Sequence, residues 1–266
     1  MKGLMKALSG MVFACLSLMT GASAATPEVE LLLYKRDPWL MVIGSDSPLA
    51  ACYADGLMIF LDPASSSNSG QSGPGYKSVR LDAAERGELQ ARMKALDTLQ
   101  PYYELSHATD QPTTQLVFRS GGKLRQSSAY GGVPAEMAQF IGFLGNLQMQ
   151  AYARAANWKP AFLEIMLWPF EHARGEPTPW PKEFPGLDSP AAVKRGKDSY
   201  SLYQPAAREE KFRDFLKTRR GAVLLDGKKW AVAMRVPFPH EIPKSLTARP
   251  ADPQTAPDDR NAPVNP

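Results

Sequence analysis

The stretch "ATDQPTTQLVFRSGG", residues 108–122, predicts a β-strand that enters a tight turn. Pro112 fixes φ and has no amide hydrogen, so it suits the first residue of a strand or an edge strand. The two threonines after it favour extended backbone, and Asp110 is suited to accept hydrogen bonds from nearby amides in a turn. Gly121-Gly122 then separate "QLVFR" from "KLRQSSAY", which predicts a β-hairpin. We therefore assign structural roles, not catalytic ones, to residues 110–114.

Two further turns of the same kind lie elsewhere in the chain. Asp55-Gly56 separates two apolar runs, and Asp226-Gly227 precedes "KWAVAMRV", residues 229–236. Both residue types tolerate positive φ, so each pair predicts a hairpin. In the last run, large and small side chains alternate, which is typical of a half-buried strand.

Three helices are predicted between these strands. The first begins with a capping box at Asp82 and Glu85. The second begins at Pro134, and the third begins at Pro205 and ends by Gly221. Their apolar residues recur at helical spacing and are expected to face the core: Leu89, Met93 and Leu96; Met137, Phe140, Ile141, Leu144 and Leu147; Phe212, Phe215 and Leu216.

This order of elements predicts an α+β fold, with hairpin-rich antiparallel sheets and the three main helices packed on one face. We expect an N-terminal α+β domain at residues 25–157 and a C-terminal α+β subdomain at residues 158–242. Ser65–Gly75 has the composition of a flexible loop. Residues 243–266 are rich in proline, aspartate and asparagine, which predicts a disordered tail.

The N-terminus predicts a cleaved signal peptide at residues 1–24. Lys2 and Lys6 precede an apolar stretch, and Ala22-Ser23-Ala24 fits an A-x-A cleavage site. The apolar part is too short to span a bilayer, so we expect no transmembrane segment after cleavage. A periplasmic or secreted protein follows. The alternative is a lipid anchor at Cys15, which the bulky Phe13 disfavours.

Charge and cysteine content exclude several classes of protein. The chain carries 31 Lys and Arg against 27 Asp and Glu, and loss of Lys2 and Lys6 lowers its net charge from +4 to +2. This weakly basic balance does not indicate binding to nucleic acid. Without Cys15, Cys52 is the remaining cysteine and no intramolecular disulfide forms. Cys52 lies in a strand-like run, which favours a buried small apolar residue over a nucleophile.

The sequence lacks the usual catalytic patterns, so we predict no catalytic residues, metal or cofactor. No G-x-S-x-G occurs, and the S-x-x-K at residues 120–123 lies in the Gly-Gly turn where a helix start is required. His107, His172 and His240 lack the spacing of zinc ligands. The remaining acid-base candidate is His107 with Asp110, if the loop brings them together.

An aromatic and proline-rich stretch, "LWPFEHARGEPTPWPKEFPGLDSP" at residues 167–190, contains the candidate binding residues Trp168, Trp180 and Phe184. Tryptophan is enriched at binding hot spots, and proline lowers the entropy cost of ordering a loop. The alternative is that these rings pin the loop onto the second subdomain.

Residues 53–147 resemble a domain of exported bacterial proteins that has no assigned function. The motifs that carry the resemblance are Tyr53-Ala54-Asp55-Gly56, Asp110-Gln111-Pro112-Thr113-Thr114, Tyr130-Gly131 and Pro134, in that order. The run "WAVAMRVPFPHE", residues 230–241, also resembles the end of some secreted proteins. The resemblance supports the fold and implies no catalytic residue.

We therefore expect an exported, non-catalytic protein that binds a protein partner in the cell envelope, as an inhibitor or immunity protein does. One alternative is a glycan or small-molecule binder that uses its tryptophan-rich loops. A third hypothesis is a hydrolase that uses dispersed carboxylates or His107 with Asp110.

Overall fold

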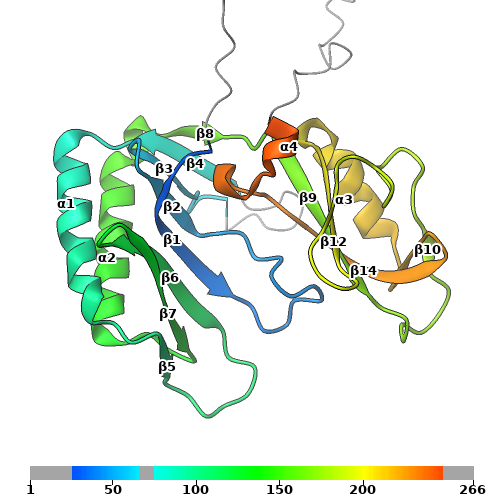
Figure 1. Ribbon diagram of the computed structural model, residues 1–266, viewed down its shortest axis with the longest axis horizontal. Helices are drawn as coiled ribbons and strands as arrows, with labels where there is room; N and C mark the ends of the chain where they lie inside the picture. The colour runs from blue at the N-terminus through cyan, green and yellow to red at the C-terminus, as the bar shows by residue number, and fades with distance from the viewer. Residues whose placement is uncertain (1–25, 66–74, 248–266) are drawn as a thin grey trace, which may run out of the picture.

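The structure, a computed structural model, describes residues 26–65 and 75–247. The predicted signal peptide, nearly all of the predicted flexible loop and residues 248–266 lie outside this part. Within it, the α+β prediction is confirmed: two open, largely antiparallel sheets are accompanied by three helices longer than one turn (Figure 1).

The first sheet, sheet A, has the strand order β5-β7-β6-β1-β2-β3-β4-β8. Its strands are β1 (Val29–Arg36), β2 (Ala50–Tyr53), β3 (Leu57–Leu61), β4 (Tyr76–Arg80), β5 (Tyr102–Glu104), β6 (Thr113–Ser120), β7 (Lys123–Tyr130) and β8 (Ala156–Trp158). The predicted hairpins are present. Gly56 connects β2 to β3 at φ 85°, and Gly121 and Gly122 connect β6 to β7 at φ 54° and 77°.

Two helices cover one face of sheet A. Helix α1 (Ala83–Lys94) begins with the predicted capping box between Asp82 and Glu85, and a 3-10 turn, η2 (Ala95–Thr98), follows it. Helix α2 (Ala135–Ala151) has Pro134 as its N-cap and ends in η3 (Tyr152–Arg154). Their predicted apolar faces pack on alternate residues of the central strands, including Leu31, Met58 and Phe118, in one buried core.

The second sheet, sheet B, has the order β10-β13-β14-β9-β12-β11. Its strands are β9 (Phe162–Pro169), β10 (Thr178–Pro179), β11 (Ala192–Lys194), β12 (Tyr200–Pro205), β13 (Val223–Leu225) and β14 (Lys228–Arg235). Asp226 and Gly227 form the predicted turn at φ 49° and 73°. After η4 (Ala206–Arg208), α3 (Glu209–Thr218) places Phe212 in a core with Ile165 and Val232 of sheet B.

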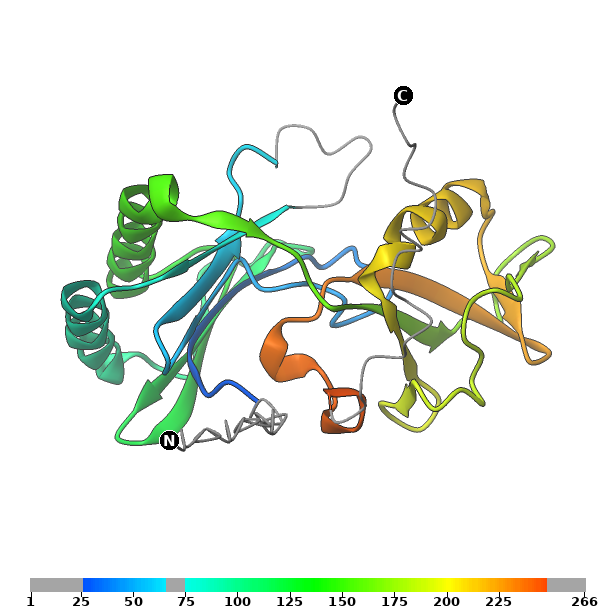
Figure 2. The ribbon, with the colours of Figure 1, turned by 90° about the horizontal axis from the view of Figure 1, so that it is seen from above.

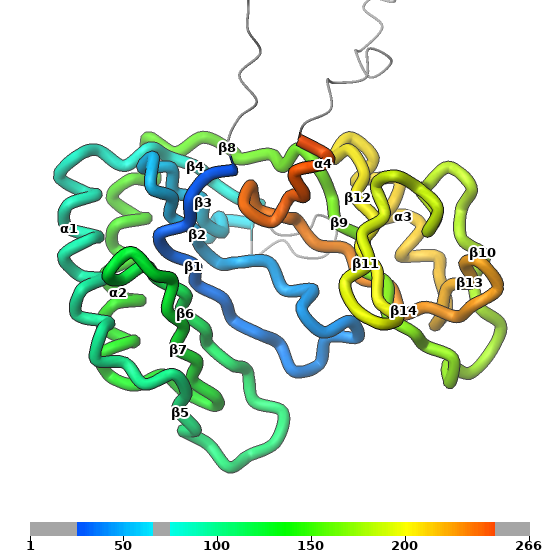
Figure 3. Tube along the Cα trace, in the orientation of Figure 1, coloured from blue at the N-terminus to red at the C-terminus, as the bar shows by residue number. Residues whose placement is uncertain are grey.

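The chain crosses from sheet A to sheet B after β8, and its end returns from β14 to sheet A. Seen from above, α1 and α2 lie on the side of sheet A that faces away from sheet B (Figure 2). The returning segment, residues 236–247, contains η5 (Pro239–Glu241) and α4 (Lys244–Thr247) and lies between the sheets (Figures 2 and 3). There Val236 and Phe238 join a buried cluster with Leu32 and Tyr53 of sheet A.

This returning segment changes one predicted boundary. The predicted disordered tail begins at residue 243, but Lys244–Thr247 is helical and Leu246 is buried. Burial of an apolar side chain explains why this turn is fixed. The rest of the predicted tail lies outside the described residues.

Candidate functional site

The loop between β1 and β2, residues 37–49, exposes a group of large apolar side chains. Trp39 is 74% exposed, Met41 52% and Ile43 73%. We call residues 37–49 the apolar loop. Single exposed apolar residues are ordinary, but several neighbouring ones mark an interaction surface.

The apolar loop is held in one conformation by its own contacts. The amide of Asp37 donates to the Asp46 carboxylate (3.0 Å), and the amide of Trp39 donates to the Asp37 carboxylate (2.9 Å). The amide of Ser45 donates to the carbonyl of Val42 (3.2 Å), whose side chain is only 1% exposed. Val42 therefore anchors the loop, while its neighbours on both sides point outward.

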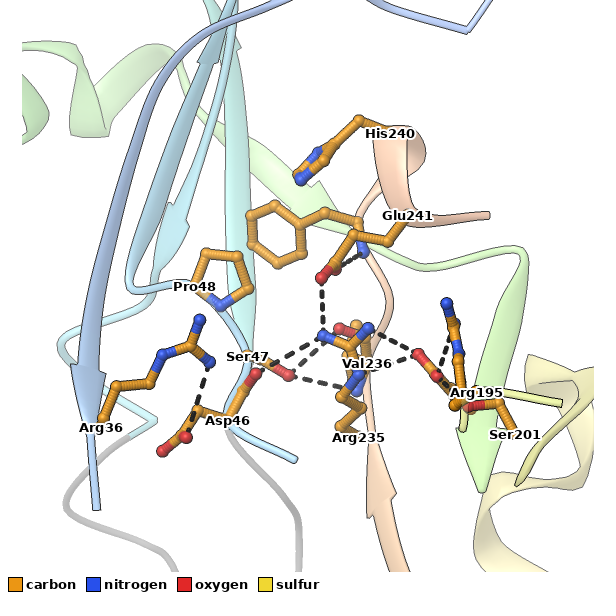
Figure 4. Close-up of polar contacts among 12 residues, drawn as sticks. Arg36, Asp46, Ser47, Pro48, Arg195, Ser201, Arg235, Val236, His240 and Glu241 are labelled. Atoms are coloured by element: carbon orange, nitrogen blue, oxygen red, sulfur yellow. Dashed lines mark hydrogen bonds and ion pairs between the residues drawn. The ribbon is translucent and has the colours of Figure 1, made fainter. Parts of the chain in front are cut away.

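The base of the apolar loop is bonded to the end of β14 and to Val236, the residue that follows it (Figure 4). Ser47 Oγ donates to the carbonyl of Val236 (3.1 Å), and the amide of Val236 donates to Ser47 Oγ (3.3 Å). Arg235 Nη1 lies 3.5 Å from the Asp46 carbonyl, and Arg36 forms an ion pair with the Asp46 carboxylate (3.6 Å). These contacts join the loop to a buried polar network on sheet B.

Glu164 of β9 is the centre of this network and is fully buried. It lies opposite Arg235 of β14 on one side and Tyr203 of β12 on the other. Arg235 Nε donates to Glu164 Oε2 (2.8 Å), and Arg235 Nη2 forms an ion pair with the same oxygen (2.6 Å). Arg195 Nη2 donates to Oε1 (2.8 Å), and the Ser201 hydroxyl also donates to Oε1. Both carboxylate oxygens are thus occupied.

The charges of this network are fixed. Burial by itself raises the pKa of Glu164, but Arg235, Ser201 and Arg195 outweigh it and hold that pKa below its ordinary value. Burial by itself lowers the pKa of Arg235, but Glu241, at 2.6 Å, and Glu164 raise it. A saturated carboxylate that stays ionised is a poor general acid or base. The network therefore acts as a structural clamp between β9, β14 and η5.

His240 lies next to this clamp on the returning segment. Its Nδ1 is 2.9 Å from the hydroxyl of Tyr53 on β2, so the pair bridges η5 and sheet A. Burial lowers the pKa of His240, and it raises the pKa of Tyr53. Both side chains are therefore held neutral, and the contact is a hydrogen bond between neutral groups.

The three predicted binding residues do not form one surface. Phe184 is 5% exposed and Trp180 is half-buried, and both contact Phe212 of α3. Trp168, which is 41% exposed, alternates along β9 with the core residue Leu167 and so faces away from α3. Trp180 and Phe184 thus follow the alternative prediction, in which the rings of this stretch pin the loop onto the second subdomain. Of the three, Trp168 is the most exposed.

The predicted acid-base pair lies on the exposed loop between β5 and β6. His107 and Asp110 are both exposed, and within the described residues neither side chain forms an ion pair or hydrogen bond. Asp110 has φ 60°, and the loop is fixed by Tyr130, whose hydroxyl donates to the Ala108 carbonyl (2.8 Å) and accepts from the Gln111 amide (3.1 Å). The strand begins at Thr113, so Pro112 lies just before it and is not its first residue. The predicted hydrogen bonds from nearby amides to Asp110 do not form among the described residues. This is the geometry of a turn.

Cys52 is buried in the core of sheet A, as predicted, and burial raises the pKa of its thiol to about 12. Among residues 26–65 and 75–247, no group of three or more His, Cys, Asp or Glu side chains is arranged to hold a metal ion. No helix in the same ranges is both long and apolar enough to cross a membrane.

Sequence reasoning missed the apolar loop. Its run "WLMVI", residues 39–43, lies between Asp-Pro and Gly. Turn-forming residues such as these also flank short buried strands, so the pattern alone does not show whether the run is exposed. Comparison with protein-family models, curated proteins and solved structures found no match to this chain.

Proposed function

We propose that this protein is an exported, non-catalytic protein that binds a protein partner in the cell envelope through the apolar loop. The observation that carries the proposal is the joint exposure of Trp39, Met41 and Ile43 on a fixed loop. Large apolar side chains at the centre of an interface supply most of its binding energy.

The ordered state of the apolar loop favours binding. Contacts of Asp37, Val42 and Ser47 hold it before any partner arrives. A loop that is already ordered loses little conformational entropy on association, so more of the burial energy appears as affinity. Protease inhibitors also bind with little change of their interface backbone, which supports an inhibitor-like role for this chain.

The two other hypotheses have less support at their predicted residues. A glycan binder that uses the tryptophan-rich stretch has only Trp168 exposed, because Trp180 and Phe184 pack on α3. A hydrolase has neither a converging acid-base pair at His107 and Asp110 nor a free carboxylate at Glu164.

Site-specific photo-crosslinking tests the proposal. The full-length gene is expressed in its source organism with a photoreactive phenylalanine analogue at Met41, and in parallel at Met149 on α2, which is 63% exposed. We expect one discrete protein adduct from position 41 and none from position 149. The adduct is identified by mass spectrometry and the partner is purified.

Titration of the purified partner then measures the contribution of the loop. Trp39→Ser and Ile43→Ser should each weaken binding at least 30-fold, which corresponds to the loss of about 2 kcal/mol at a hot spot. Met149→Ser is the matched control and should bind like wild type. Equal adducts at positions 41 and 149, or unchanged affinity in both loop variants, would refute the assignment.

A further inference from the structure

A hollow lies where the two sheets meet, on the side of α3. Its volume is about 690 Å³, and its walls come from both halves of the molecule. Tyr76 and Trp158 belong to sheet A, whereas Pro205 and Ala207 come from the end of β12 and from η4. Cavities of this size at the boundary between two structural units are preferred places for small ligands.

One wall of this cavity is a fixed aromatic surface. The Trp158 ring meets the Tyr76 ring edge-on, with centroids 5.9 Å apart, and lies 5.2 Å from the Phe238 ring. These contacts hold the indole in one orientation. Trp158 is only half-buried, and it lines the cavity. It therefore presents an aromatic surface that a ligand meets without reorganisation of the protein.

The cavity also offers polar groups. Lys159 and Glu209 line it. Arg213 donates to Glu209 Oε1 from Nε (2.8 Å) and Nη2 (2.5 Å), and among the described residues Oε2 accepts no hydrogen bond.

We propose that this cavity binds a neutral saccharide of one or two rings. A sugar presents an apolar C–H face, which suits Trp158, and hydroxyl groups, which can donate to Glu209 Oε2 and accept from Lys159. A wholly apolar ligand would leave these two charged groups desolvated without compensation. An anionic ligand would meet the Glu209 carboxylate. The site is separate from the apolar loop, so it goes beyond the proposed function and does not depend on it.

Isothermal titration calorimetry with cellobiose and with N,N′-diacetylchitobiose tests the site on the purified protein. We expect saturable binding of at least one disaccharide. Ala207→Phe fills the cavity from an exposed position and should abolish the binding, whereas Ala138→Phe, on an exposed position of α2, should leave it unchanged. The pair changes the same residue type on the surface and removes no packed group.

Glu209→Gln tests the role of the carboxylate. We expect affinity to fall about tenfold, because a hydrogen bond to a charged group becomes one to a neutral group. Circular dichroism checks that each variant remains folded. The proposal is overturned if neither disaccharide binds at millimolar concentration, or if Ala207→Phe binds a disaccharide as wild type does. It is also overturned if the apolar dye 1-N-phenylnaphthylamine binds in the cavity and neither sugar displaces it. These outcomes are independent of the crosslinking result.

Discussion

Removal of Arg235 from the buried clamp should strongly destabilise the protein. The side chain of Arg235 is 9% exposed and contacts Glu164, which is fully buried, and Glu241, whose side chain is 14% exposed. In the variant Arg235→Met, Glu164 Oε2 loses its hydrogen bond from Nε and its ion pair with Nη2, whereas Arg195 and Ser201 remain at Oε1. The buried carboxyl group of Glu164 is then left with one unsatisfied oxygen.

The expected loss is about 3–5 kcal/mol in the free energy of unfolding, the usual cost of breaking a buried ion pair. For a chain of this size, each kcal/mol lowers the melting temperature by about 2–4 °C. We therefore expect the melting temperature to fall by roughly 6–20 °C. Arg92→Met is the matched control. Arg92 pairs with Glu88 on the surface of α1, and loss of such an exposed pair costs less than about 1 kcal/mol.

Urea unfolding followed by circular dichroism and by tryptophan fluorescence measures both variants. The double variant Glu164→Leu with Arg235→Met removes both buried charges and should recover most of the loss, because apolar replacement of a buried ion pair is often neutral. The reasoning fails if Arg235→Met loses less than about 1 kcal/mol. It also fails if the double variant is as unstable as the single one.

Two further predictions concern the junction and a turn. Because burial lowers the pKa of His240, the folded state binds a proton less readily than the unfolded state, so stability falls as the pH falls below the unfolded value of about 6.5. Urea midpoints at pH 7.5 and 5.5 should differ for wild type and differ less for His240→Gln; an equal difference would contradict the assignment. Gly131→Ala should cost roughly 1–3 kcal/mol, because φ is 69° and the added Cβ would lie 2.2 Å from Ser106 Cβ. An unchanged unfolding midpoint would show that the turn relaxes freely.

Features that depend on neighbouring residues were predictable from the sequence. The Asp226-Gly227 turn needs two residues with positive φ, and the α1 cap needs an acceptor and a carboxylate three positions apart, at Asp82 and Glu85. Both signals are complete within one short segment. The apolar spacing of the helices is equally local, because a helix face repeats every few residues.

The clamp and the apolar loop were not predictable in this way. Glu164 sits in the apolar run "FLEIML", and nothing beside it indicates that its partners Arg195 and Arg235 lie 31 and 71 residues further on. The aromatic-proline stretch has the composition of a contact loop, but two of its rings, Trp180 and Phe184, pack on Phe212 of α3. Whether an apolar residue is exposed depends on which surfaces the complete fold leaves uncovered. The residues next to it in the sequence do not determine this.

The bond between Ser47 and Val236 joins residues separated by 189 positions. At a synthesis rate of 5–20 residues per second, a ribosome needs roughly 10–40 s to make the chain between them. During that interval Phe238 has not yet been synthesised, so the surface of sheet A against which it packs stays exposed to solvent. The nascent chain cannot complete its tertiary structure until then. A chain whose C-terminal residues complete the core through contacts with distant N-terminal residues folds slowly. That delay suits the proposed export, since passage through a translocation pore requires a chain that has not yet folded.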